Sequence, residues 1–529
     1  MDARLRAKEP KRLALFVDHP GSPLVALTGQ RWGRRSRVVV LSTAEEAHMT
    51  LNSQSMRADR DVLVPARRSH AVLTAYGPFD AIIDATSSND EAKHARLKDT
   101  FFHLRRNGSY LLQIRRPEDG ITCGDDNFAE AVSSAAVDNN GVHLLTNGRP
   151  ALPKLRYAEL DDLLEMRPDI GAFLTRLPEL SFPSACDVTA NIDRLNRRLL
   201  PTITVPSLGL RVYYDSICAP HQVLVARRAV LPDTYRHYTQ PKLRNHCLRD
   251  VDDRFARYRR SLKPQQILDG EYFYLGSEHP QHFGHVMTEQ LSRLWAWDEV
   301  KRRYPNARAL VSLKKDRTEL TMFELAIFQA AGVAPQDLFP VKTAVRVEKL
   351  LAAAPMFVNP AYAHPDLTKV WRRVGDALLA AAPLRQYPER IFVARGGTYP
   401  NRTCLNGGEV EQVFERSGYV VIYPEDYGLA EQAMMFDRAR VVAGYAGSGL
   451  FNLIFSRSAK DVVLLTARTY AAPNEYLIAS VLGHPLHLIW CEPAQARSAG
   501  QARTRFQSDF VFDFERDGGY LSSLLRRLG

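Results

Sequence analysis

The most informative stretch of the sequence is Arg440-Val-Val-Ala-Gly-Tyr-Ala-Gly-Ser-Gly-Leu-Phe-Asn-Leu-Ile-Phe455. An apolar, β-branched run predicts a buried strand, which enters a turn containing Gly447 and Gly449 before a helix begins near Leu450. Glycines in such a turn permit positive φ and let a ligand approach the backbone closely. The helix N-terminus behind them offers unpaired N–H groups and the positive end of a dipole, which together favour a phosphate.

Two polar side chains of the same stretch can add hydrogen bonds to such a ligand. Ser448 lies between the two glycines, and Asn452 follows in the predicted first helical turn. The alternative interpretation is a tight strand-to-helix connection that binds nothing, and a bare Gly-x-Gly taken alone favours that alternative.

A second strand, Arg390-Ile-Phe-Val-Ala-Arg395, ends in an arginine, and the loop after it carries Arg402, Asn406 and Glu409. Two arginines beyond the carboxyl end of a strand can hold a diphosphate through charge-assisted, bidentate hydrogen bonds without a metal. Solvated surface arginines are the alternative, and they are common in a chain this basic.

Glu431 occupies the first turn of a helix predicted to begin near Leu429, after a strand that stops at Pro424. Its carboxylate can bond to sugar or ribose hydroxyls if the start of the helix faces a cleft. The helix dipole alone also explains an early acidic residue, and this alternative stays open.

A fourth segment, His282-Phe-Gly-His-Val-Met-Thr-Glu-Gln-Leu-Ser-Arg-Leu-Trp295, predicts an amphipathic helix. His285 and Glu289 are i,i+4 neighbours on the face opposite the apolar one, so the carboxylate can orient the imidazole. Such a pair can serve as the general base for a sugar hydroxyl. The alternative is a hydrated helix face with an incidental pair.

The whole chain reads as three α/β units without internal repeats. Short apolar runs that suit buried strands alternate with helical stretches. The first unit has predicted strands at 13–17, 38–41, 80–84 and 109–114 and a helix at about 90–105. The second has strands at 222–226, 272–275 and 309–312 and helices at roughly 283–303 and 318–331. The third has strands at 390–394, 419–423, 440–443 and 461–465 and a terminal helix at 520–528.

Composition narrows the class of protein. The 529 residues carry 70 Lys and Arg against 59 Asp and Glu, a net charge of +11, with an ordinary 45% hydrophobic content. Disordered, fibrous and disulfide-stapled classes are excluded, and an anionic partner is indicated. The six cysteines show no metal-ligand spacing, which favours a reducing compartment. The basic N-terminus lacks the apolar region of a secretory signal, and no apolar run approaches the ~20 residues of a membrane span.

These motifs, in this order, resemble those of glycosyltransferase family 61, which includes enzymes of capsular polysaccharide biosynthesis. The segment 283–295 is similar to the family's Gly-His-Phe-x-x-Glu-x-x-Ser-Arg-Leu-Trp helix, and 395–409 to its arginine and Asn-x-x-Glu loop. The blocks 424–432, 439–444 and 447–452 resemble its most specific region. The similarity spans roughly residues 210–495 and is strongest over 388–456.

The resemblance implies an α/β protein with a GT-B-like pair of Rossmann-type domains, preceded by a separate Rossmann-like domain. The implied segments are a Rossmann-like domain at 1–150, a linker at 151–205, an acceptor domain at 206–380 and a nucleotide-sugar domain at 381–529. It implies an inverting, metal-independent transferase with His285 and Glu289 as catalytic residues. The implied donor-binding residues are Arg395, Arg402, Asn406, Glu409, Glu431, Gly447, Ser448, Gly449 and Asn452.

One position departs from the family pattern. The family usually has His-Gly-Ala-Gly-Leu where this chain has Ala446-Gly-Ser-Gly-Leu450, so a histidine is replaced by Ala446. If that imidazole touches a substrate, this protein uses another group, such as Tyr445 or His285, or its activity is altered or lost. A catalytically inactive glycan-binding or scaffold protein is therefore the second hypothesis.

The N-terminal unit resembles a different group. Phe79-Asp-Ala-Ile-Ile-Asp84 and Leu104-Arg-Arg-Asn-Gly-Ser-Tyr-Leu-Leu-Gln-Ile114 are similar to the second half of a class I methyltransferase. The first loop, Asp18-His-Pro-Gly-Ser-Pro23, has one glycine where such folds carry a Gly-x-Gly-x-Gly loop for S-adenosylmethionine. Its prolines remove N–H donors, so we expect a degenerate domain, with a working methyltransferase as a third hypothesis.

The expected partners follow from the resemblance. They are a nucleotide sugar, as substrate, and a glycan or lipid-linked glycan acceptor, with no cofactor and no metal, since no Asp-x-Asp lies near the sugar-binding segments. Dispersed positive charge and the lack of a nucleic-acid motif argue against nucleic acid. The expected location is the cytoplasm, with peripheral association at the inner face of the membrane left open.

Overall fold

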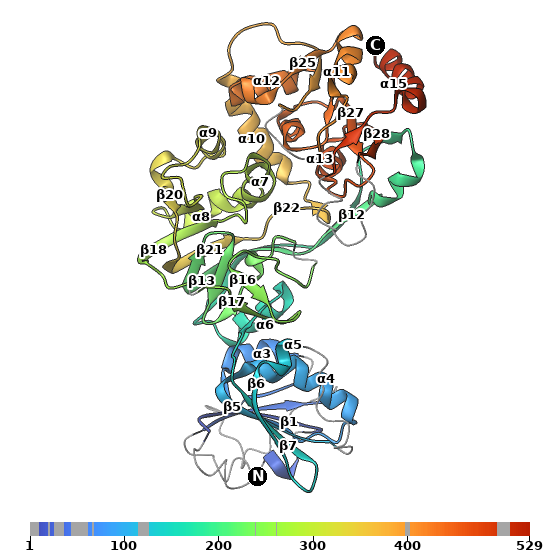
Figure 1. Cartoon of the computed structure of the whole chain (residues 1–529). Coiled ribbons are helices and arrows are strands. Elements are labelled where there is room, and N and C mark those ends of the chain that lie inside the picture. Colours follow the sequence, from blue (N-terminus) through green and yellow to red (C-terminus); the bar gives the residue numbers. More distant parts are fainter. Residues whose placement is uncertain are drawn as a thin grey trace. The chain divides into compact units, whose positions relative to one another are not determined.

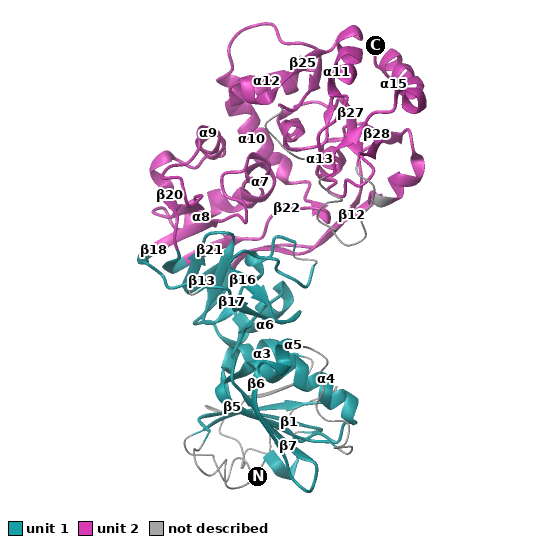
Figure 2. Ribbon diagram, viewed as in Figure 1, with its two compact units in different colours: residues 1–173, 212–269, 344–349 teal, residues 174–211, 270–343, 350–529 magenta. Residues whose placement is uncertain are grey.

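The computed structural model (Figure 1) is divided into two compact units, which are described separately. The structure describes residues 10–19, 22–25, 36–43, 62–65, 68–114, 126–237, 240–260, 262–396, 402–494 and 508–529. Unit 1 comprises residues 1–173, 212–269 and 344–349, and unit 2 comprises 174–211, 270–343 and 350–529 (Figure 2). The chain crosses between the two units after residues 173, 211, 269, 343 and 349.

A seven-stranded sheet forms the N-terminal part of unit 1, in the order β3-β2-β1-β4-β5-β7-β6. Its strands are β1 (Arg12–Val17), β2 (Arg37–Ser42), β3 (Val62–Pro65), β4 (Phe79–Asp84), β5 (Leu104–Gln113), β6 (Val132–Val137) and β7 (Val142–Asn147). The accompanying helices are α3 (Ser69–Tyr76), α4 (Asp90–Thr100), η2 (Phe101–His103) and α5 (Asp126–Ala129). The first five strands are parallel, and their 3-2-1-4-5 order is that of doubly wound nucleotide-binding folds. The predicted Rossmann-like N-terminal fold is confirmed.

The carboxyl ends of β1 and β4 mark the point at which the strand order reverses, where doubly wound folds bind their ligands. Here Asp84, at the end of β4, is fully buried and forms an ion pair with Arg96 of α4. Asp18, after β1, accepts the backbone N–H of Ser87 at 2.9 Å. Protein groups thus satisfy both carboxylates, whereas Pro20 and Gly21 of the first loop lie outside the described residues.

The remainder of unit 1 is mostly antiparallel. Strand β13 pairs with β14 and β14 with β15, while β17 pairs with both β16 and β8. The elements are β8 (Leu152–Pro153), α6 (Tyr157–Met166), β9 (Gly171–Leu177), β13 (Leu208–Ala219), β14 (Val223–Ala226), β15 (Ala229–Val230), η5 (Pro232–Thr234), β16 (Leu248–Asp250), β17 (Phe255–Tyr258), β18 (Gln266–Leu275) and β21 (Val345–Ala353).

Unit 2 contains a sheet in the order β11-β28-β27-β26-β24-β25, with β29 antiparallel to β28. The six strands of the main path are parallel. They are β11 (Val188–Ala190), β24 (Arg390–Val393), β25 (Val420–Ile422), β26 (Val441–Tyr445), β27 (Asp461–Ala467) and β28 (Leu486–Pro493), beside β29 (Phe510–Val511). The helices are α10 (Leu367–Ala380), α11 (Gly407–Arg416), η9 (Pro424–Asp426), α12 (Leu429–Arg438), η10 (Ser448–Phe455), α13 (Asn474–Leu482) and α15 (Phe514–Leu528). Buried apolar residues of β24, β26 and β27 pack with α11 and α15 in one core.

A second parallel group in unit 2 consists of β18, β19 and β20. Its elements are α7 (Phe283–His285), η6 (Val286–Gln290), η7 (Leu291–Ala296), α8 (Trp297–Arg303), β19 (Arg308–Ser312), α9 (Met322–Ala330), η8 (Pro335–Asp337) and β20 (Leu338–Val341). Short elements complete the unit: β10 (Leu180–Pro183), η4 (Asp193–Arg198), β12 (Thr202–Val205), β22 (Phe357–Val358) and β23 (Tyr362–Ala363).

The α/β class with Rossmann-type parallel sheets is confirmed by these two units. The predicted division at residues 150, 205 and 380 stays a prediction, because the compact units follow other boundaries. The predicted linker, 151–205, carries α6 and strands β8 to β12. No helix among the described residues combines the length and the apolar composition that crossing a bilayer requires.

Candidate functional site

The glycine turn after β26 has a conformation that only glycine adopts without strain. Gly447 has φ +151° and ψ −175°, and the helical turn η10 begins directly after it, at Ser448. Strand β26 is buried along its whole length, so the backbone emerges from the core at this point. The sequence correctly predicts this strand and turn, although the helix begins two residues earlier than expected and has 3₁₀ geometry.

Replacing Gly447 by alanine should lower the free energy of unfolding by about 1–3 kcal/mol, the usual range for such a backbone conformation in a non-glycine residue. Denaturant unfolding of the full chain measures this. Gly408→Ala is the matched control, since a Cβ at that position in α11 meets nothing within 4 Å. Equal stability of the Gly447→Ala variant and the wild type would contradict the assigned turn geometry.

One N–H of the turn already has a partner within the protein. The Gly447 N–H donates to Oε1 of Glu475 over 2.7 Å, and this carboxylate is 1% exposed. Nδ2 of Asn452 donates to Oε1 of Gln432 and to the Gly449 carbonyl, both at 3.0 Å. These hydrogen bonds join the turn to neighbouring side chains of the protein. The Gly447 N–H is therefore already bonded and does not bind a phosphate.

Arginine side chains adjoin the same turn. Nη1 of Arg395 lies 3.5 Å from the Ala446 carbonyl and 3.5 Å from the place that a Cβ on Gly447 would occupy. The guanidinium of Arg402 lies 5.6 Å from the ring centroid of Tyr470, whose hydroxyl donates to Glu475. Both arginines are partly exposed, so positive charge is available to an anion at this turn.

The predicted His–Glu pair forms in the structure. Nδ1 of His285 lies 2.7 Å from Oε1 of Glu289, and the hydroxyl of Ser277 donates to the other carboxylate oxygen at 3.3 Å. A carboxylate can only accept, so a neutral His285 carries its proton on Nδ1 and keeps a lone pair on Nε2. The two side chains are 15% and 21% exposed, which leaves them accessible to a substrate.

The helix that carries this pair is irregular. The predicted helix at 283–303 is helical throughout but changes from α to π over 286–290, then to 3₁₀, and returns to α at Trp297. The predicted hydrated face is also largely buried, since Thr288 is 8% and Ser292 0% exposed. Single π turns of this kind are frequent at functional sites. The face is therefore not a hydrated one, while a catalytic role for the pair stays a prediction.

Gly284 brings the His–Glu pair and the glycine turn together. A Cβ at Gly284 would lie 3.0 Å from the Cβ of Ser448 and 3.2 Å from the ring of Phe451. Such distances are closer than side chains normally pack, so a Cβ at this position would require Ser448 and Phe451 to shift by a few tenths of an ångström. His285 follows Gly284 directly in the chain, so the helix that carries the His–Glu pair packs against η10 at this point.

Two more of the predicted donor-binding residues have other partners, and a third is exposed. The Asn406 side chain donates to the Phe512 carbonyl at 2.8 Å and accepts the Phe512 N–H at 3.0 Å, so it ties α11 to the C-terminal segment. Glu431 forms a 2.8 Å ion pair with Arg385. Glu409 is exposed in the first turn of α11. Their roles toward a donor stay predictions.

The sequence patterns did not single out Glu475, Tyr470 or the second and third histidines near His285. His279 and His282 place their ring centroids 4.6 Å and 4.8 Å from that of His285. The spacing of the three histidines, His-x-x-His-x-x-His over residues 279–285, could have indicated a cluster. Glu475 offered no comparable signal, because it lies 28 residues beyond the turn that it contacts.

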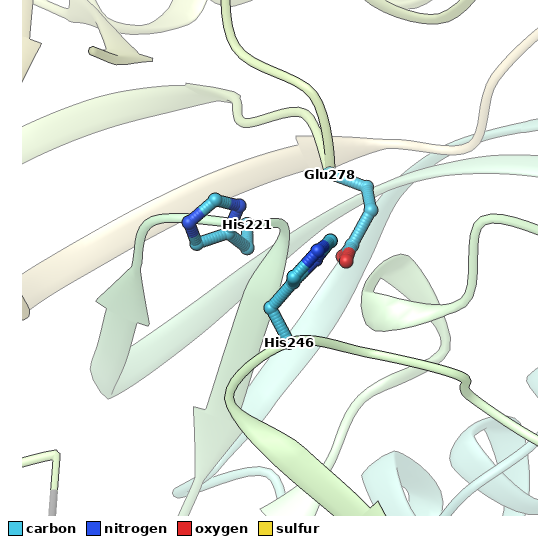
Figure 3. Close-up of side chains that lie close together, drawn as sticks. All are labelled: His221, His246 and Glu278. Atoms are coloured by element: carbon cyan, nitrogen blue, oxygen red, sulfur yellow. The ribbon is translucent and has the colours of Figure 1, made fainter. Parts of the chain in front are cut away.

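Two histidines of unit 1 lie close together, away from the residues described above. Figure 3 draws His221 and His246, whose ring centroids lie 4.8 Å apart, together with Glu278. The two histidines belong to unit 1 and Glu278 to unit 2, so the three do not form a site within either unit.

Comparisons with known proteins agree with the motifs. Residues 283–463 match the family described as Glycosyltransferase 61, and no curated protein matches the chain. The MycE methyltransferase of the mycinamycin biosynthetic pathway, solved with Mg and SAH, is 15% identical over 28% of this chain and 48% of its own, with a TM-score of 0.21. This chain thus spans about half the length of that protein. Human methyltransferase-like protein 13, solved with SAH, is 15% identical over 31% of this chain and 84% of its own, also with a TM-score of 0.21. These similarities say nothing about activity.

Proposed function

We propose that this chain, whose residues 283–463 form a glycosyltransferase 61 domain, is an inverting enzyme that transfers a sugar from a nucleotide sugar to a glycan hydroxyl. The observation that carries the proposal is the close approach of Gly284 to Ser448, next to Arg395. This approach supports the proposal because it joins the helix that carries the His–Glu pair to the turn that Arg395 flanks. The acceptor belongs to a surface or capsular polysaccharide or a related, including lipid-linked, glycan.

His285 acts as the general base in this proposal. Its Nε2 takes the proton of the acceptor hydroxyl while that oxygen forms a bond to the anomeric carbon of the donor sugar. The bond from this carbon to the diphosphate oxygen breaks at the same time, and its electron pair leaves with the nucleoside diphosphate. One such displacement inverts the anomeric configuration. Glu289 holds the imidazole in the required tautomer and stabilises the cation that forms.

The leaving diphosphate gains charge as the bond breaks, and Arg395 and Arg402 stabilise it. Positive groups that are already in position lower the activation barrier of the transfer, because they need not reorient while charge develops on the diphosphate. Two arginines suffice for this in principle, so the proposal needs no metal. The reaction takes place in the cytoplasm or at the inner face of the membrane, where nucleotide sugars are made.

A thermal-shift screen with UDP-, GDP-, TDP- and CMP-sugars tests donor binding. We expect one nucleotide class to raise the Tm of the full chain by several degrees at millimolar concentration, because binding to the folded state alone stabilises it. The free nucleoside diphosphate should give much of the same shift, since the arginines contact the diphosphate. A chain whose Tm is unchanged by every member of the panel would not be a nucleotide-sugar enzyme.

A catalytically inactive glycan-binding or scaffold protein is the second candidate. Two observations favour it: Ala446 replaces the family's histidine, and its side chain is only 3% exposed, in a closely packed position. In that case the chain binds glycan but neither transfers nor hydrolyses any nucleotide sugar. Turnover by the purified protein distinguishes the two candidates.

A further inference from the structure

A buried carboxylate lies under the glycine turn and belongs to a different helix. Glu475 is in the first turn of α13, and its Oε1 accepts the Gly447 N–H at 2.7 Å. The hydroxyl of Tyr470, also buried, donates to Oε2 at 3.1 Å. Among the described residues none forms an ion pair with Glu475, and a glutamate this buried is rarely unpaired, because removing its charge from water is costly. Apolar packing alone therefore does not explain why a glutamate occupies this buried position.

The surroundings of Glu475 connect it to the arginines of the candidate donor site. Arg402 lies over the ring of Tyr470, and its charge acts to lower the pKa of the Glu475 carboxyl. Arg395 lies beside the Ala446 carbonyl of the turn. Glu475 thus touches the backbone of the turn directly and one of the two arginines through Tyr470.

We propose that Glu475 is a positioning residue of the donor site, which holds the Gly447 turn and couples the binding of a diphosphate to the uptake of a proton. This inference rests on the proposed function, since it assigns a diphosphate to the arginines at the turn. An anion bound there repels the Glu475 carboxylate, and protonation of the carboxylate relieves that repulsion. The neutral acid still accepts the Gly447 N–H through its carbonyl oxygen, so the turn keeps its shape.

The titration of Glu475 supports this coupling. Burial raises the pKa of its carboxyl to about 7, against the opposing effects of the Gly447 N–H, the Tyr470 hydroxyl and Arg402. The pKa in the folded chain lies above the ordinary value of 4.5, so the folded state binds more protons between these values and loses stability as pH rises through them. Glu475→Gln should therefore have a higher Tm than the wild type at pH 8 and a similar one at pH 5.

The test is calorimetric titration of the full chain with UDP, GDP, TDP and inorganic pyrophosphate at pH 6 and pH 8, in buffers of different ionisation enthalpy. When a probe binds, the wild type should take up more protons than Glu475→Gln. The difference can be assigned to Glu475, because any protonation of the probe itself occurs with both proteins. The affinity of the wild type for the probe should fall between pH 6 and pH 8 by about tenfold more than the affinity of Glu475→Gln. A tenfold change in affinity corresponds to a shift of one unit in the pKa of Glu475 on binding. Glu415→Gln, an exposed glutamate of α11, is the matched control and should behave as the wild type.

The outcomes separate the two proposals. Equal proton uptake and equal pH dependence in wild type and Glu475→Gln would overturn the role of Glu475 while leaving diphosphate binding intact. Failure of the wild type to bind any of the four probes would overturn the proposed function, and the role of Glu475 with it. Glu475→Ala adds a check on the turn: it removes the acceptor of the Gly447 N–H, so affinity should fall at least tenfold at both pH values, and unchanged affinity in a folded variant would refute the positioning role.

Discussion

Arg395→Ala is expected to lower kcat/KM for the nucleotide sugar by about 10²–10³-fold, the usual loss when one fixed group that stabilises developing charge is removed. The reason is its position beside Gly447, where the guanidinium can contact the leaving diphosphate. Its loss should affect both donor affinity and turnover, since the charge on the diphosphate grows as the bond breaks. Steady-state release of nucleoside diphosphate measures both.

Two further variants make this result specific to the site. Arg416→Ala removes an exposed arginine at the end of α11 and should leave the rate unchanged, which controls for the lost charge. Arg395→Lys keeps the charge but not the planar fork and should recover only part of the rate. Full activity of a folded Arg395→Ala chain would remove Arg395 from the donor site.

His285→Ala should lower kcat by about 10²–10⁴-fold with little change in KM for the donor, the range for loss of a general base. Glu289→Gln should have a smaller effect, because the amide can still contact Nδ1 but no longer stabilises an imidazolium. Steady-state kinetics of both variants at one pH measure these losses.

His282→Ala serves as the control for this prediction. His282 is exposed and has its ring centroid 4.8 Å from that of His285, whereas the Glu289 carboxylate contacts Nδ1 of His285. It should keep most of the activity. If His282→Ala loses activity and His285→Ala retains it, the base has been assigned to the wrong histidine.

Much of the fold follows from local patterns. Buried parallel strands are continuous apolar runs, so strands such as β1, β26 and β27 begin and end within one or two residues of their predicted limits. The helix at 283–303 was predicted in extent but not in geometry, because its π and 3₁₀ turns depend on what packs against it. The short strands of 151–205 lack clear periodicity, since their partners lie elsewhere in the chain.

The candidate site was predictable where its contacts are local. The pair His285 and Glu289 follows from i,i+4 spacing, and the Gly447 turn follows from its glycines. The contact of Gly447 with Glu475 joins residues from two separate βα units and leaves no trace in spacing or periodicity. Asn406 shows the converse: its motif predicts a ligand-binding residue, whereas its amide is bonded to the Phe512 backbone.

The most direct test of the central claim is time-resolved NMR of the full chain with the donor selected by the thermal-shift screen, with water in place of the acceptor. The account predicts slow release of nucleoside diphosphate and a first-formed free sugar of inverted anomeric configuration, both strongly reduced in His285→Ala. Retention of configuration, or no turnover of a donor that binds, would contradict it.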